Sequence, residues 1–239
     1  MKDDFVIGVL GGMGTYATIH LFKQYAEVFP AVKEWDRPRI IIDNRCTMPS
    51  RVLAFLHHEK EDELISEMSD SMQHLIDSGA THIVLACNTS HLFLPAIYKN
   101  VPELEPRVQN IILNCVERIK IDCLKEVFLL GSEGTIESGV YQSALSQEGI
   151  KCLYPTPDEY ANLRICIEAV KQNNYSDAVK QKFIGLIGDH RSCILGCTEL
   201  PIIFERYKTD IPCINSYDPL LITLEKIKTD YNKNKGILK

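Results

Sequence analysis

Short, largely apolar runs recur along the chain, and each is followed by small or polar residues and then by a segment with helical spacing. Residues 5–10, 39–43 and 82–86 are such runs, and runs of this kind are typical of strands buried on both faces of a parallel sheet. Apolar residues recur every three or four positions in residues 15–29 and 59–78, which predicts helices with one buried face. A further helix is expected after Cys87 and ends at about residue 99. We therefore expect an α/β fold with parallel sheets and right-handed crossovers.

The same alternation starts again near the middle of the chain. It predicts further strands at residues 110–113, 126–131, 151–154, 192–196 and 211–214. It predicts further helices at residues 115–124, 136–147, 158–172, 176–188 and 218–231, and a loop at residues 44–51. We interpret the chain as two similar Rossmann-like domains. The first comprises residues 1–108 plus 211–239, because the last strand and helix are expected to return to it, and the second comprises residues 109–210.

Two strands run into a cysteine in matching contexts. Cys87 follows the apolar strand of residues 82–86, and Cys197 follows a second such strand 110 residues later. Ligands of open parallel sheets bind outside the carboxyl ends of the strands. A thiol at such a turn also lies near a helix N-terminus, where unpaired N–H groups favour the thiolate. The repetition, rather than either cysteine alone, indicates a pair of acid/base thiols.

Several chemistries use two thiols, and the spacing separates them. Disulfide exchange favours a Cys-x-x-Cys motif, which the chain lacks. Zinc would need more ligands than Cys193 and Cys197 supply, and no second ligand pair is evident. One thiolate that removes a proton from carbon, opposite a thiol that returns one, would invert a stereocentre by general acid–base catalysis. That reaction fits the pattern best.

The turn after the first strand supports a competing interpretation. Gly12, Gly14 and Ala17 match a loose dinucleotide-binding fingerprint, and Asp43 ends the next strand. The interval from Ala17 to Asp43 is longer than usual, and a tight turn beside a small acid also needs glycine. A nicotinamide-dependent oxidoreductase therefore stays open as an alternative.

Polar residues near these turns are candidates for holding a substrate. Three of them offer side-chain donors or backbone amides to a carboxylate: Asn88, Thr89 and Thr198. Arg51 can bind a carboxylate through two parallel hydrogen bonds. His91 either tunes Cys87 or fills the core, and Glu199 either caps its helix or contacts a substrate ammonium group. The sequence leaves both choices open.

Composition narrows the class of protein. The net charge is −6, which argues against nucleic acid as a partner because such proteins usually present a basic face. No apolar run reaches the roughly 18 residues of a membrane span, and the first residues lack the pattern of a signal peptide. The nine scattered cysteines do not suggest a disulfide framework. We therefore expect a cytoplasmic protein whose other cysteines are small buried hydrophobes.

Taken together, these motifs resemble those of the aspartate/glutamate racemase family, which works without a cofactor. The matching segments appear in the family's order: residues 8–14 with Ala17 and Thr18, residues 86–91, Gly134 and Thr135 with residues 138–141, and residues 196–199. The two cysteine motifs are the specific part of the resemblance, which is to the aspartate-racemase branch.

The resemblance implies two Rossmann-like domains with an active site in the cleft between them, and a homodimer. It implies interconversion of L- and D-amino acids without pyridoxal phosphate, another cofactor or a metal ion. Cys87 and Cys197 match the family's two acid/base groups. Met13, Arg51, Asn88 and Thr89 match residues that line the substrate. The turns add three more expected substrate contacts: Thr135, Thr198 and Glu199.

One departure from the family concerns the choice of substrate. Members often carry a lysine early in the helix that follows residues 155–159, where it meets the substrate side chain. Residues 160–164 contain no lysine here, and Arg164 is out of register. We expect a racemase acting on aspartate, glutamate or a related amino acid. A non-catalytic amino-acid-binding relative is the second open alternative.

Overall fold

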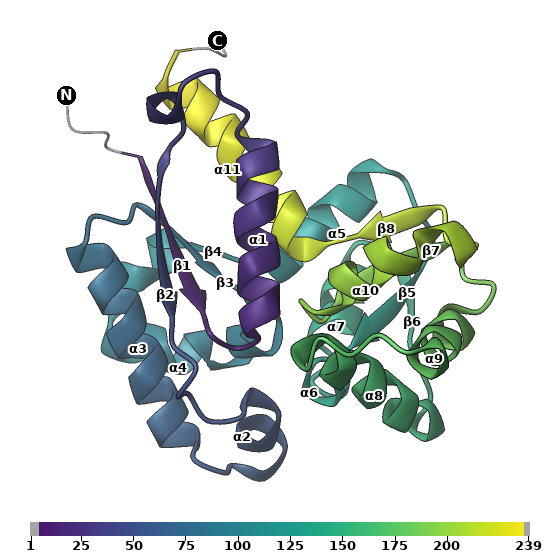
Figure 1. Ribbon diagram of the computed structural model, residues 1–239. Helices are drawn as coiled ribbons and strands as arrows, with labels where there is room; N and C mark the ends of the chain where they lie inside the picture. Colours follow the sequence, from purple (N-terminus) through teal and green to yellow (C-terminus); the bar gives the residue numbers. More distant parts are fainter. Residues whose placement is uncertain (1–4, 237–239) are drawn as a thin grey trace. The chain divides into compact units, whose positions relative to one another are not determined.

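The computed structural model describes residues 5–236 of the chain, which fall into two compact units (Figure 1). The first unit comprises Met1–Ile111 with Leu220–Lys239, and the second comprises Ile112–Pro219. Each unit contains a four-stranded parallel sheet covered by helices. The expected α/β fold with two similar parallel-sheet domains is confirmed.

The first sheet has the strand order β2-β1-β3-β4. Its strands are β1 (Val6–Gly11), β2 (Arg39–Asn44), β3 (His82–Leu85) and β4 (Val108–Gln109). Every residue of β1 is buried, as expected for a central strand whose two faces both carry apolar residues. Leu10 pairs with Asp43 on one side and with Leu85 on the other. The carboxyl ends of β1, β2 and β3 therefore lie at one edge of the sheet.

Helices cover both faces of the first sheet. They are α1 (Thr15–Val28), α2 (Arg51–His57), α3 (Glu61–Asp77), α4 (Leu94–Asn100) and α11 (Pro219–Asn234), with short 3₁₀ helices η1 (Glu34–Asp36), η2 (Thr89–Phe93) and η3 (Pro102–Arg107). The Cα of Gly8 faces Leu75 of α3, whereas the Cα of Gly11 faces Thr18 of α1. Because residues three apart on a strand point to opposite faces, α3 and α1 lie on opposite sides of the sheet.

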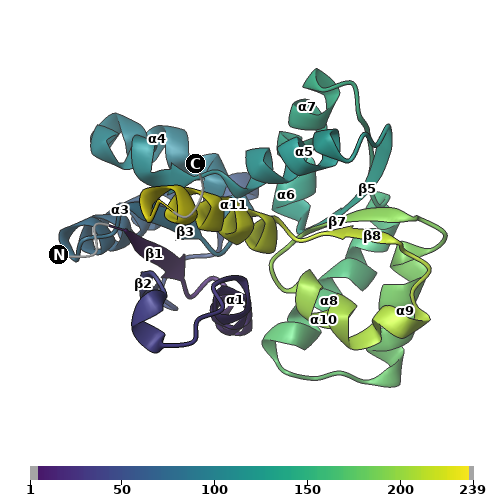
Figure 2. The ribbon, with the colours of Figure 1, turned by 90° about the horizontal axis from the view of Figure 1, so that it is seen from above.

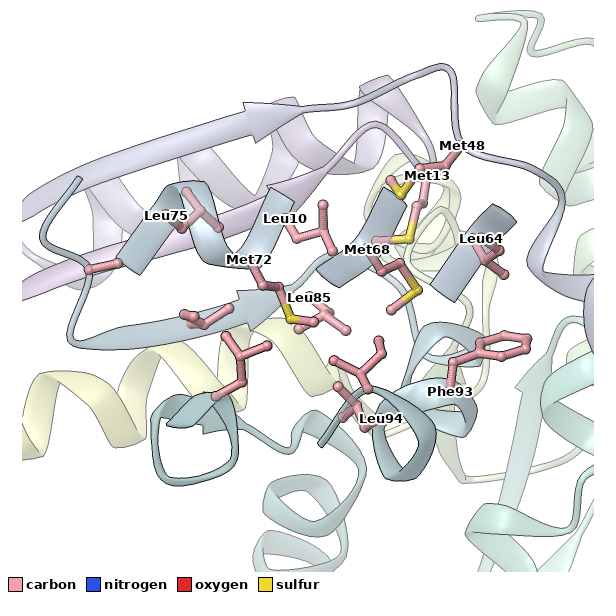
Figure 3. Close-up of a cluster of buried hydrophobic side chains, with 14 of the residues drawn as sticks. Leu10, Met13, Met48, Leu64, Met68, Met72, Leu75, Leu85, Phe93 and Leu94 are labelled. Atoms are coloured by element: carbon pink, nitrogen blue, oxygen red, sulfur yellow. The ribbon is translucent and has the colours of Figure 1, made fainter. Parts of the chain in front are cut away.

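The face under α3 contains a methionine-rich core (Figure 3). Met68 and Met72 project from α3 between Leu10 and Leu85 of the strands, and all four side chains are fully buried. Each such side chain contributes roughly 1.5–3 kcal/mol relative to leaving it exposed. This core fixes the strand ends from which the candidate site is built.

The second sheet repeats the same topology, with the order β6-β5-β7-β8. Its strands are β5 (Glu126–Gly131), β6 (Lys151–Leu153), β7 (Ser192–Gly196) and β8 (Asn215–Tyr217). Figure 2 shows α5 (Ile111–Ile121) and α7 (Val140–Gln147) on one side of it and α8 (Tyr160–Lys171), α9 (Asp177–Ile187) and α10 (Leu200–Tyr207) on the other. The remaining short helices are α6 (Glu133–Glu137), η4 (Pro157–Glu159) and η5 (Lys208–Asp210).

Three sequence-based assignments were wrong, and one helix was not predicted. The loop expected at residues 44–51 ends where the unpredicted helix α2 begins at Arg51, and Ser50 caps α2 by accepting a hydrogen bond from the Leu53 N–H at 3.3 Å. The expected strand at 110–113 is the start of α5. The helix expected at 136–147 is split at Gly139, whose φ is 67°. The last strand is β8 rather than residues 211–214, and it pairs with β7 of the second sheet instead of returning to the first.

The last helix does return to the first unit. Tyr231 of α11 packs edge-on against Phe5 and Phe29, and its hydroxyl donates to the Asp36 carbonyl at 2.7 Å. These two aromatic contacts and the hydrogen bond of the Tyr231 hydroxyl hold α11 beside α1 (Figure 1). Within residues 5–236, no helix is both long enough and apolar enough to cross a membrane.

Candidate active site

Cys87 lies just beyond the carboxyl end of β3. The Ala86 N–H donates to the Leu10 carbonyl at 2.9 Å, so main-chain pairing continues up to the residue before the thiol. Cys87 is half-buried, and Asn88 and Thr89 are 2% and 4% exposed. The helix expected directly after Cys87 starts as the five-residue 3₁₀ turn η2 before α4 begins. The thiol therefore has less support from a helix dipole than the sequence suggested.

His91 is a structural part of this turn. Its Nδ1 lies 3.0 Å from the Cys87 carbonyl oxygen, and its Nε2 accepts from the Ile111 N–H at 3.4 Å. Burial lowers the pKa of His91 below its ordinary value, which favours the neutral imidazole. Nδ1 therefore carries the proton and donates it to the carbonyl. With both nitrogens bound to the main chain, His91 holds the turn and does not touch the thiol.

Met13 and Arg51 join the turn after β1 to the start of α2. The Arg51 Nη1 donates to the Pro49 carbonyl at 2.8 Å, and its Nη2 donates to the Met13 carbonyl at 3.1 Å. Its Nε is buried and bonds to no described residue. The Met13 side chain lies beside Met48 in the hydrophobic cluster (Figure 3). It is only 4% exposed, and its sulfur accepts a hydrogen bond from the Ser90 hydroxyl at 2.7 Å. Met13 therefore offers a substrate its main chain more than its side chain.

The glycine turn has a packing explanation. Gly12 has φ 80°, and a Cβ at this position would lie 2.3 Å from the Arg45 carbonyl carbon, so only glycine fits. In a dinucleotide site, the carboxylate of Asp43 would accept a hydrogen bond from the ribose hydroxyl. Here it accepts a hydrogen bond from the Ser71 hydroxyl at 2.5 Å and pairs with the Arg45 Nε at 3.3 Å. Neither observation favours a dinucleotide site.

Cys197 occupies the equivalent place in the second sheet, directly after β7. It is half-buried, and the Leu200 N–H donates to its carbonyl at 2.9 Å. Its thiol donates to Oε2 of Glu199 at 3.0 Å, and the Thr198 hydroxyl donates to the same oxygen at 3.4 Å. Thr198 and Glu199 are 3% and 2% exposed. This turn therefore brings together a thiol, a hydroxyl and a buried carboxylate.

Thr135 lies at the same edge of the second sheet. Gly131 at the end of β5 pairs with Gly196, so the turn after β5 lies next to the Cys197 turn. Ser132 begins α6, and its hydroxyl oxygen accepts from the Thr135 N–H at 3.3 Å. Thr135 itself is 1% exposed. The structure thus groups Met13, Arg51, Cys87, Asn88 and Thr89 in the first unit and Thr135, Cys197, Thr198 and Glu199 in the second.

Cys193 does not join Cys197 in a metal site. It lies inside β7, is completely buried, and its thiol bonds to the His190 carbonyl at 3.9 Å and to the Cys213 thiol. Within residues 5–236, no group of three or more histidine, cysteine, aspartate or glutamate side chains is arranged to hold a metal ion.

A family model for Asp/Glu/hydantoin racemases matches residues 10–224, which is most of the chain and includes both cysteine turns. The chain belongs to this racemase family. The expected resemblance is confirmed, and the family's members include isomerases that act on amino acids.

Named relatives of this racemase-family chain are amino-acid racemases. The broad-specificity amino-acid racemase RacX of Bacillus subtilis is 28% identical over 221 residues, which covers 88% of this chain and 92% of RacX. The glutamate racemase of Aquifex aeolicus is 24% identical over 183 residues, covering 74% of this chain and 68% of that protein. The solved aspartate racemase of Picrophilus torridus shares the fold, with a TM-score of 0.78, 24% identity and coverage of 97% of this chain and 94% of that one.

Lys171 is a candidate site residue of this racemase-family protein that the sequence analysis missed. It is the last residue of α8. Burial lowers its pKa, but its hydrogen bond to Glu168 and its electrostatic interactions with Glu199 and Cys197 together raise that pKa above its ordinary value. Its ammonium group therefore lies within electrostatic reach of the Cys197 turn. The helical spacing of α8 continues through Lys171, so counting along that helix could have found it.

The positions considered for the family lysine have other partners. Arg164 pairs with Glu133 at the start of α6, so its charge is already matched. Asn162 accepts a hydrogen bond from Lys182 of α9 at 2.7 Å. A lysine therefore does reach the Asn162 region, but from the neighbouring helix.

Proposed function

We propose that this protein is a cofactor-independent amino-acid racemase that interconverts L- and D-aspartate, or a closely related acidic amino acid. Cys87 and Cys197 act as the two acid/base groups, one removing the Cα proton and the other delivering a proton to the opposite face. Each transfer breaks one S–H or C–H bond and forms the other, so the thiols exchange protonation states in each turnover.

One observation carries this proposal. Two sheets with the same strand order each place one half-buried cysteine directly after the equivalent strand, β3 in one unit and β7 in the other. A chance core cysteine needs no counterpart, whereas a reaction that inverts a stereocentre needs two matched groups. The amino-acid racemases among the relatives support the same reaction class.

The surrounding residues are proposed to bind the substrate carboxylate and ammonium groups. Asn88 and Thr89 supply donors beside Cys87, while Thr135 and Thr198 supply them in the second unit. Donors placed where negative charge develops stabilise an enolate-like transition state. Two nitrogens of the Arg51 guanidinium are bound to main-chain carbonyls, which leaves its Nε as the donor for a carboxylate. Oε1 of Glu199 can accept from the ammonium group.

The preference for an acidic side chain rests on Lys171. A cation close to the Cys197 turn attracts a second carboxylate and repels a basic side chain. This location supports aspartate or glutamate over neutral amino acids.

The test is racemisation in deuterated water with a panel of L- and D-amino acids, read by chiral chromatography and mass spectrometry. We expect both isomers of aspartate to exchange Cα hydrogen and to approach a one-to-one mixture. Cys87→Ser and Cys197→Ser should each lower kcat by at least about 10³-fold, because a serine hydroxyl is a far weaker acid and base catalyst at neutral pH than a thiol.

Cys123→Ser is the matched control, since Cys123 is an exposed thiol in the turn that follows α5, and it should retain full activity. Racemisation retained in either Cys87→Ser or Cys197→Ser would contradict the two-thiol mechanism. A protein that is thermally stabilised by one amino acid but never racemises it would instead be a binding relative.

We also propose that the protein is a cytoplasmic homodimer. Tyr16, Ile19 and Phe22 form an exposed apolar row along α1, at 37%, 58% and 49% exposure, and contiguous apolar rows of this kind mark association surfaces. Light scattering after gel filtration should give twice the 27.1 kDa of one chain. A monomeric mass at micromolar concentration would contradict the dimer.

A further inference from the structure

Glu199 is a buried carboxylate in direct contact with one of the two candidate thiols. Its Oε2 accepts from the Cys197 thiol at 3.0 Å and from the Thr198 hydroxyl at 3.4 Å. Its Oε1 is buried and accepts from no described residue. A carboxylate at 2% exposure with one bare oxygen is unfavourable for folding alone, which points to a role in function.

The contact distances indicate where the proton lies. Oε2 of Glu199 accepts from the Thr198 hydroxyl as well as from the Cys197 thiol, so the proton of the shared contact lies on sulfur. Two donors that converge on Oε2 fit an ionised acceptor, because a carboxylate only accepts. The 3.0 Å separation of sulfur and oxygen is also short, as charge-assisted hydrogen bonds are.

Lys171 of α8 acts in the opposite direction, since its positive charge favours a thiolate on Cys197. Its ammonium group is hydrogen-bonded to Glu168 at 2.8 Å, and its side chain is 38% exposed. Solvent and Glu168 therefore screen its field. Glu199 touches the thiol and is shielded from water, so the carboxylate has the larger effect.

We propose that Glu199 is a positioning residue that holds the proton on Cys197, so that Cys197 waits in the free protein as the proton donor. The inference rests on the proposed function only in treating Cys197 as an acid/base group. Within residues 5–236, no carboxylate hydrogen-bonds to the thiol of Cys87, so no group comparable to Glu199 holds a proton on that sulfur. When Cys197 gives its proton to Cα, its electron pair stays on sulfur beside Glu199, which makes that thiolate a stronger base for the reverse step.

The test is iodoacetamide labelling of the substrate-free full chain at a series of pH values, with the rate at each cysteine read by peptide mass spectrometry. In the wild type, Cys87 should label faster than Cys197 at neutral pH. Glu199→Gln should speed Cys197 labelling by about threefold to tenfold. For any thiol, lowering the pKa by one unit raises the thiolate fraction about tenfold, whereas the nucleophilicity of each thiolate falls by a smaller factor. The racemisation pH profile should move toward lower pH in the same variant.

Glu199→Asp keeps the negative charge and should label Cys197 close to the wild-type rate. Glu205→Gln is the matched control, because Glu205 is an exposed carboxylate of α10 paired with Lys208. An unchanged Cys87 rate checks that each variant is folded.

Two results would overturn the proposal. One is a Cys197 rate that is unchanged or slower in Glu199→Gln. The other, which needs no variant, is a wild-type Cys197 that labels faster than Cys87. Absent racemisation together with the expected labelling pattern would contradict the proposed function and leave the role of Glu199 supported.

Discussion

The two cysteine turns end equivalent strands, yet a different kind of side chain supports each one. In the Cys87 turn, the buried imidazole of His91 bonds to the main chain at both nitrogens. In the Cys197 turn, the buried carboxylate of Glu199 bonds to the thiol itself. One partner is neutral and fixes the backbone, and the other is charged and acts on the proton. Matching architecture therefore does not make the two thiols chemically equivalent.

Replacing His91 by alanine should give the largest effect, a loss of stability. An unchanged stability would contradict the structural role that this comparison gives to His91. The variant leaves the Ile111 N–H and the Cys87 carbonyl without their partner and opens a cavity, for a loss of about 3 kcal/mol in the free energy of unfolding. Urea denaturation measures this loss. Glu199→Gln is nearly isosteric and should lose less than about 1 kcal/mol. A larger loss for Glu199→Gln than for His91→Ala would reverse the roles assigned to the two turns.

Replacing Lys171 by methionine tests whether the Cys197 turn, unlike the Cys87 turn, contributes a positive charge to substrate binding. Removal of its charge from the Cys197 turn should raise the KM for aspartate about tenfold, equivalent to about 1.4 kcal/mol of binding, because Glu168 and solvent screen part of that charge, with a smaller change in kcat. Steady-state kinetics with D- and L-aspartate measure the effect. Lys182→Met, on α9, is the matched control and should leave KM within about twofold. If only Lys182→Met raised the KM, the substrate contact would instead lie near Asn162.

The smallest expected effect is on the pH dependence of stability. Burial lowers the pKa of His91 in the folded protein below the unfolded value of about 6.5. Its contribution is therefore complete above about pH 6.5 and is lost as the pH falls through the folded pKa, at a rate of up to about 1.4 kcal/mol per pH unit.

Denaturation at several pH values below neutrality measures this slope, and His91→Gln should flatten it. Burial also lowers the pKa of His82, so His82→Gln is the comparison, and its change in slope should be smaller because His82 is less buried. Equal slopes in the wild type and His91→Gln would show that His91 is already free to take up protons in the folded protein.

The strand ends, and the placement of Cys87 and Cys197 just beyond two of them, were predictable because they depend on local pattern. Apolar runs that stop at Gly11, Ala86 and Gly196 identify strands whose carboxyl ends must carry the loops. The helices after Cys87 and around Gly139 were predicted less well. There, three-residue spacing does not distinguish a 3₁₀ turn or a break from a continuous helix.

The partners of the site residues could not be predicted, because they come from distant segments. The bond from His91 to Ile111 joins residues 20 apart, and the bond from Arg51 to Met13 joins residues 38 apart. Lys171 and Cys197 are also far apart in sequence and belong to different elements. The alternatives for His91 and Glu199 stayed open in the sequence because each depends on such a contact.

The return of α11 to the first unit bears on how the protein is made. Tyr231 of α11 packs on Phe5 and Phe29, but α11 follows the whole second unit in the chain. During synthesis, all residues of the second unit leave the ribosome before α11 does, so the second unit can fold as a continuous segment. The first unit must wait for its closing helix. We therefore expect that ribosome-bound chains ending before α11 would protect the Cys197 turn from proteolysis earlier than the Cys87 turn.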